Sequence, residues 1–171
     1  MRFREYGADF MFANFPNDTL VVGISASGGT QRVEEALQRA AAASDKVITV
    51  ALTGNPESRV AKAASRVISA KLPFIGPSPG IRTYNATLMA LSLLAIRIGE
   101  IRGRYHNHAA NAMREEMAGV SNVIAATLEA NRDVTEAAAK AFAASPTMVW
   151  LGSGPSFGTA MFSAAKVVEA A

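Results

Sequence analysis

Cysteine is absent from the 171-residue sequence, and aromatic (7%) and charged (18%) residues are scarce. A chain without cysteine forms no disulfide, has no thiol nucleophile and offers no thiolate to a metal ion. The net charge is only +3 and no dense run of Lys or Arg occurs, which gives little support to nucleic-acid binding. Half of the residues are hydrophobic, which is typical of packed helices and strands rather than of a disordered chain.

Long hydrophobic runs are absent too. The longest, residues 88–96, includes Ser92 and is far shorter than the ~20 residues that a membrane-spanning helix needs. Residues 1–5 open a polar stretch that lacks the apolar core of a signal peptide. We therefore expect a cytoplasmic protein with no membrane and no nucleic-acid partner.

The first half of the chain alternates between strand and helix patterns. Short β-rich runs lie at 20–24, 47–52 and 67–68, and amphipathic helical patterns separate them at 31–43 and 56–65. The first two runs are almost continuously apolar, which is typical of strands that are covered on both faces of a parallel sheet. This order predicts a doubly wound, three-layer α/β fold with right-handed crossovers.

The second half is almost entirely helical. One more strand is predicted at 148–151, and the predicted helices are 82–102, 111–129, 133–144 and 159–171. We expect three parts, namely the later part of a first α/β unit (1–101), a helical connector (102–147) and the opening strand, loop and helix of a second unit (148–171). A three-stranded parallel sheet leaves unpaired edges and the last helix has no cap, so we expect either part of a longer chain or sheets completed by dimerisation.

A glycine-rich loop, Ser-Ala-Ser-Gly-Gly-Thr at 25–30, lies between the first strand and the first helix. Its small residues allow a ligand to approach the backbone, and the helix start and the hydroxyls of Ser25, Ser27 and Thr30 can donate hydrogen bonds to an anion. No lysine closes the loop, so it is not the phosphate loop of nucleotide hydrolases. Alternatively, the glycines form a tight turn and Ser27 only caps the helix. Three hydroxyls exceed what capping requires, so we favour a phosphate site.

The run 23–30 resembles the Ser-x-Ser-Gly-x-Thr signature of sugar isomerase (SIS) domains, and 52–56 and 58–64 are similar to segments that follow it in that family. The resemblance covers about 18–101 and resumes at 149–171, as in two-module members such as the isomerase half of glucosamine-6-phosphate synthase. It implies a homodimer that binds a phosphorylated sugar or amino sugar and needs no metal or cofactor. It also implies a set of residues that hold the phosphate: Ser25, Ser27 and Thr30 through their hydroxyls, and Ala26 and Gly28 through their amides.

The resemblance adds a second group of residues that contact the sugar. Residues 78–82 match a family segment that includes such contacts, which implies roles for Ser78, Gly80 and Arg82, although Gly80 stands where the family has a serine. This departure indicates a subfamily other than the synthase. Ser153 lies in a second glycine-rich loop, 152–158, where Pro155 removes one amide donor.

Lys166 and Glu169 are three residues apart, which places them on one face of the predicted last helix. Spacing alone favours an ordinary surface ion pair. The family resemblance instead implies that Glu169 is the base that moves a proton between C1 and C2 of the sugar, with Lys166 assisting at the oxygens. The family's ring-opening histidine would fall beyond Ala171, and His106 and His108 are read as solvated residues of the connector.

Three hypotheses follow. The leading one is a phosphosugar isomerase, deaminase or deglycase that works through an enediol-type proton transfer. The alternative is a non-catalytic module that senses a sugar phosphate, although no helix-turn-helix of a regulator is visible. The third is that this chain has no activity by itself.

Overall fold

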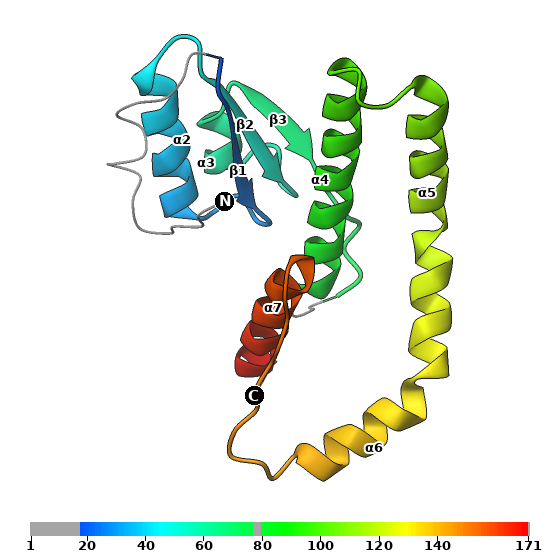
Figure 1. Cartoon of the computed structure of the whole chain (residues 1–171). Coiled ribbons are helices and arrows are strands. Elements are labelled where there is room, and N and C mark those ends of the chain that lie inside the picture. Colours follow the sequence, from blue (N-terminus) through cyan, green and yellow to red (C-terminus); the bar gives the residue numbers. More distant parts are fainter. Residues whose placement is uncertain (1–17, 77–79, 171) are drawn as a thin grey trace. The chain divides into compact units, whose positions relative to one another are not determined.

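The structure is a computed structural model that describes residues 18–76 and 80–170 (Figure 1). The chain divides into two compact units, Met1–Arg102 and Gly103–Ala171, and each is described by itself. The described elements of the first unit are β1 (Leu20–Ser25), α2 (Gln31–Ala43), β2 (Ile48–Thr53), α3 (Arg59–Lys62), β3 (Arg66–Ser69) and α4 (Ile81–Ile101).

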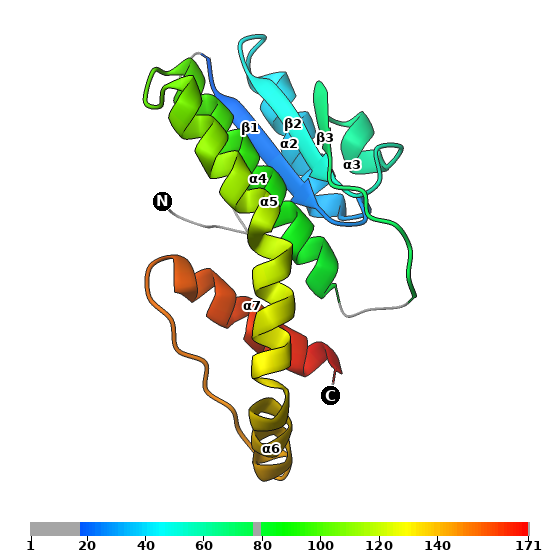
Figure 2. The same cartoon turned by 90° about the vertical axis from the view of Figure 1, so that its right-hand side faces the viewer.

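The three strands form one sheet in the order β1-β2-β3, and both pairs are parallel. Helices α2 and α3 cover one face of this sheet and α4 lies on the other (Figure 2). A parallel pair needs a crossover, and the amphipathic α2 supplies it between β1 and β2. The predicted parallel three-layer α/β fold is therefore confirmed.

The core lies between the sheet and the two helices α2 and α3. Leu37 of α2, Ala51 of β2 and Val60 of α3 are buried against one another. Val50 and Leu52 are also buried, and because side chains alternate along a strand they face the opposite side of the sheet from Ala51. Burial on both faces explains why the middle of β2, Val50–Leu52, is apolar without a break. At Gly23 a Cβ atom would lie 2.8 Å from Leu37 Cδ1, so glycine lets α2 pack closely on β1.

The second predicted helix is much shorter than expected. Residues 56–65 were expected to be helical, but only Arg59–Lys62 form α3. A turn precedes it, in which the Glu57 amide donates to Asn55 Oδ1 (3.1 Å), and the Ser58 hydroxyl then caps the helix by accepting from the Ala61 amide (3.2 Å). Side-chain oxygens that satisfy nearby amides compete with helix formation, which explains the late start.

The second unit contains α5 (Asn107–Ala130), α6 (Arg132–Phe142) and α7 (Pro155–Ala170). The strand predicted at 148–151 is wrong, because in the described residues this segment has no regular secondary structure. A strand forms only beside another strand that completes its hydrogen bonds, and all described strands belong to the first unit. The last helix begins at Pro155 rather than Thr159, which suits proline because the first helical residue needs no amide donor.

The division into a connector and the start of a second α/β unit stays a prediction. None of the helices in the described part of the chain has the length and apolar character to cross a membrane.

Candidate functional site

The candidate site begins where the parallel strands end. Ser25 at the end of β1 is the register neighbour of Thr53 at the end of β2, and Thr53 is the neighbour of Ser69 at the end of β3. Three hydroxyl side chains therefore form a row across the carboxyl edge of the sheet. Open parallel α/β sheets bind their ligands outside this edge.

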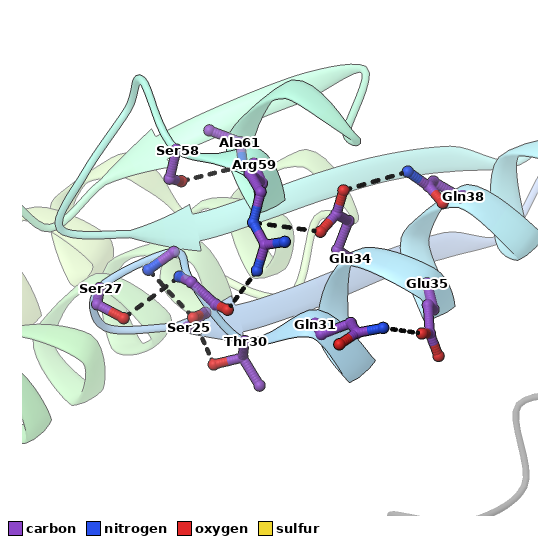
Figure 3. Close-up of polar contacts among 12 residues, drawn as sticks. Ser25, Ser27, Thr30, Gln31, Glu34, Glu35, Gln38, Ser58, Arg59 and Ala61 are labelled. Carbon is purple, nitrogen blue, oxygen red and sulfur yellow. Dashed lines mark hydrogen bonds and ion pairs between the residues drawn. The ribbon is translucent and has the colours of Figure 1, made fainter.

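The loop that follows β1 is organised around the Ser25 hydroxyl, which is almost fully buried (5% exposed residue). Ser25 Oγ accepts a hydrogen bond from the Gly28 amide (3.1 Å) and lies 2.8 Å from Thr30 Oγ1 (Figure 3). Ser27 Oγ accepts from the Gly29 amide (3.3 Å). Ser27 and Thr30 are exposed, so Ser25 is the internal support of the loop and the other two hydroxyls face solvent.

In the described part of the chain, no side chain caps the start of α2. Thr30 is the N-cap residue, and its side chain makes no capping hydrogen bond. The alternative interpretation, in which Ser27 caps this helix, is therefore wrong, although the tight turn is present as a hydrogen bond from the Gly28 amide to the Ser25 carbonyl (3.2 Å). Within the described residues the amides of Gln31 and Arg32 have no acceptor. The helix start thus keeps donors available for an anion.

Two backbone hydrogen bonds join the loop to the segment that runs from the end of β2 into α3. The Gly54 amide donates to the Ala26 carbonyl (2.9 Å), and the Val60 amide donates to the Gly28 carbonyl (3.2 Å). Gly28 has φ +71°, and a Cβ atom built on it would lie 2.0 Å from Ser58 Oγ. Only glycine fits this position, because it tolerates positive φ and leaves room for the cap of α3.

One cation reaches the loop. Arg59 Nη2 donates to the Gly29 carbonyl (2.9 Å), and Arg59 Nε lies 3.6 Å from Glu34 Oε2 in the first turn of α2. Sequence reasoning missed this residue, because 30 positions separate Arg59 from Gly29. The only available signal was its place in the segment 58–64.

The residues expected to contact the sugar lie in other segments of the chain. Gly80 is the N-cap of α4 with φ +76°, and Arg82 Nη1 lies 3.4 Å from the Pro73 carbonyl. Ser78 lies outside the described residues. In the second unit, the Ser153 carbonyl accepts from the Ser156 amide (3.1 Å) in the turn before α7. Their sugar-binding roles stay predictions.

Lys166 and Glu169 lie on one face of α7, as their spacing predicted. Lys166 Nζ forms an ion pair with Glu169 Oε2, and it also lies 5.2 Å from the centre of the Phe162 ring. The Glu169 side chain is 55% exposed. This pair belongs to the second unit and the loop to the first, so the catalytic role of the pair stays a prediction.

A metal centre is not apparent in the part of the chain that the structure describes. No group of three or more His, Asp or Glu side chains gathers there in a way that could hold an ion. His106 is the N-cap residue of α5, and His108 lies in its first turn.

Comparison with known proteins gives relatives of one kind. The glutamine–fructose-6-phosphate aminotransferase (isomerizing) of Gloeobacter violaceus is 25% identical over 96% of this chain, and that of Mycolicibacterium smegmatis is 28% identical over 98%. The chain spans about a quarter of the length of these relatives, 27% and 26% respectively.

Solved structures share the fold. One is a protein from Clostridium difficile 630 to which phosphosugar isomerase activity is ascribed. It has a TM-score of 0.63 at 17% identity, and the match covers 75% of this chain and 38% of that protein's chain. A protein from Bacillus subtilis with the same ascribed activity has a TM-score of 0.57 at 24% identity, over 72% of this chain and 35% of its own. The family model of the SIS domain matches residues 5–97, which is more than half of the sequence. The chain therefore belongs to the SIS domain family.

Proposed function

We propose that this chain binds a phosphorylated sugar or amino sugar, with the phosphate held by residues 25–30. The observation that carries this proposal is the loop itself, in which the exposed hydroxyls of Ser27 and Thr30 and the uncapped amides at the start of α2 follow the carboxyl end of β1. The relatives support the choice of ligand, since they are glutamine–fructose-6-phosphate aminotransferases.

The chemistry of the loop suits a phosphate dianion. Ser27 and Thr30 can each donate one O–H to a phosphate oxygen, and Ser25 remains hydrogen-bonded to the Gly28 amide so that the turn keeps its shape. The amides at the start of α2 add further donors, and the positive end of the helix dipole favours the negative charge. The Thr30 hydroxyl, which lies beside Ser25 Oγ, would turn its proton toward the ligand.

Calorimetric titration tests this proposal. We expect heat from glucose 6-phosphate, fructose 6-phosphate or glucosamine 6-phosphate, and none from glucose at the same concentration, because the loop recognises the phosphate. Equal binding of glucose and glucose 6-phosphate, or binding of neither class of compound, would contradict the proposal.

We also propose that the full-length protein is an isomerase, deaminase or deglycase. Glu169 would take the proton from C2 of the open-chain sugar and return it to C1. The proton of the C2 hydroxyl would pass to the C1 oxygen with the help of Lys166, so that the C1 carbonyl becomes a hydroxyl and the C2 hydroxyl a carbonyl. The enediolate formed between these two transfers needs a positive partner, and the ammonium group of Lys166 would provide it. Lys166 and Glu169 lie on one face of α7, within reach of a common ligand.

Replacing Glu169 by glutamine separates this proposal from a binding function. We expect turnover of the sugar phosphate to fall by at least 100-fold, the usual scale for loss of a general base, with affinity within about twofold. The matched control is Glu136→Gln, which breaks a similar exposed ion pair with Lys140 in α6 and should leave turnover unchanged. Unchanged turnover in Glu169→Gln would defeat the assignment of the base.

A binding module remains the second candidate function. The exposure of Glu169 and its ordinary ion pair with Lys166 favour it, because a surface pair needs no catalytic role. Sugar-phosphate binding without turnover in the full-length protein would establish this second function. For either function we propose a cytoplasmic homodimer without a nucleic-acid or membrane partner. Light scattering of the purified protein tests whether it is a dimer.

A further inference from the structure

Arg59 connects the loop to the helix that follows it. Its guanidinium donates to the Gly29 carbonyl (2.9 Å) through Nη2, and its Nε faces Glu34 Oε2 (3.6 Å), as Figure 3 shows. The planar guanidinium has several donors in fixed directions, so it can hold two acceptors at once. We propose that Arg59 is a positioning residue, which orients the Gly29–Thr30 peptide so that the Thr30 amide faces the bound phosphate. This inference rests on the proposed function of the loop.

The geometry of the peptide bond supplies the first step. In a planar trans peptide, the carbonyl and the following N–H point in opposite directions. Because the Gly29 carbonyl points to Arg59, the Thr30 N–H points away from Arg59. That N–H has no acceptor among the described residues, so it is available to a ligand.

The preceding peptide shows the same arrangement. The Gly28 carbonyl accepts from the Val60 amide of α3 (3.2 Å), and the Gly29 N–H of that peptide points the other way, to Ser27 Oγ (3.3 Å). Two successive loop carbonyls are therefore satisfied by α3, one by a backbone amide and one by the Arg59 side chain. The Gly29 amide faces the Ser27 hydroxyl, and the Thr30 amide points away from Arg59.

Glycine makes this support necessary. Gly29 has no side chain to restrict its backbone, so the Gly29–Thr30 peptide can rotate at low cost unless its carbonyl is held. The Arg59 side chain is 61% exposed, and such a contact contributes little to folding. Its loss should therefore weaken ligand binding more than it weakens the fold.

The experiment compares Arg59→Met with Arg97→Met in the full chain. Arg97 is the matched control, because its side chain is similarly exposed (65%) and pairs with Glu100 of α4 (3.4 Å) rather than with the loop. In the free protein, the ¹H–¹⁵N signal of Thr30 should move in Arg59→Met and stay in place in Arg97→Met. Affinity for glucose 6-phosphate should fall about tenfold in Arg59→Met, the scale of one charge-assisted hydrogen bond, and by less than about twofold in Arg97→Met.

A third variant, Arg59→Lys, should recover part of the affinity, since an ammonium group can still donate to the Gly29 carbonyl. An unmoved Thr30 signal in Arg59→Met would overturn the inference, and so would an equal loss of affinity in both methionine variants, which would indicate a general effect of charge. If the wild-type chain binds no sugar phosphate, the proposed function fails, while the signal of the free protein still decides whether Arg59 orients this peptide.

Discussion

Gly28→Ala should lower the free energy of unfolding by about 3 kcal/mol or more. Two costs add. A residue with a Cβ pays roughly 1 kcal/mol or more at the positive φ of this position, and the new Cβ would lie 2.0 Å from Ser58 Oγ and 2.2 Å from Ser58 Cβ. Ser58 cannot turn away freely, because its hydroxyl caps α3 through the Ala61 amide, and loss of a cap costs about 1 kcal/mol. Urea denaturation followed by circular dichroism measures the change.

Gly103→Ala is the matched control for this variant. Gly103 has φ +66°, close to the +71° of Gly28, but no atom lies within 4 Å of a Cβ built on it. It should show only the backbone cost of roughly 1 kcal/mol. If Gly28→Ala is no less stable than Gly103→Ala, the close contact between the loop and the cap of α3 does not exist in solution.

The double variant Ser27→Ala/Thr30→Val should bind sugar phosphates roughly thirtyfold more weakly than the wild type. Each substitution removes one hydroxyl donor, and hydrogen bonds to a charged group contribute ~1 kcal/mol or more each. Thr30→Val keeps the shape of the side chain, so packing at the helix start is preserved. Calorimetry with glucose 6-phosphate gives both dissociation constants.

Thr30→Ser is the control for the role of the hydroxyl. It keeps the donor and removes only a methyl group, so its affinity should stay within about threefold of the wild type. A threefold change in affinity is a smaller free-energy change than the ~1.4 kcal/mol that corresponds to tenfold. Equal affinities of the wild type and the double variant would show that the phosphate binds elsewhere. A loss in Thr30→Ser as large as in the double variant would point to packing rather than to hydrogen bonding.

The sequence was sufficient to predict the order of strands and helices in the first unit and the place of the loop. Val50, Ala51 and Leu52 of β2 are apolar and buried, and α2 carries a clear amphipathic pattern, so local composition and final burial agree there. The strand β1 is less buried than its apolar composition predicted, because it lies at the edge of the described sheet, and Leu20 and Ile24 are each 43% exposed. The loop 25–30 was predictable for the same reason, because its glycines and hydroxyl residues lie between two strongly patterned elements. The helix α2 begins and ends where the pattern predicted, at Gln31 and Ala43.

Contacts between distant segments could not be predicted in the same way. Arg59 and Gly29 meet only because β1 and β2 lie side by side, and nothing in the local pattern of either segment indicates the contact. The segment 148–151 is β-rich but forms no strand, since pairing depends on a neighbour and not on composition alone. The turn at Asn55–Glu57 shortened α3 through side-chain hydrogen bonds that periodicity does not reveal.

Diffraction from crystals soaked with glucose 6-phosphate is the most direct examination of the loop. The proposal predicts density for a phosphate group with oxygens within about 3.2 Å of Ser27 Oγ, Thr30 Oγ1 and the Thr30 amide, the ordinary range for hydrogen bonds. Crystals that hold the sugar phosphate at another position, or that show only solvent over residues 25–30 at saturating ligand, would contradict it.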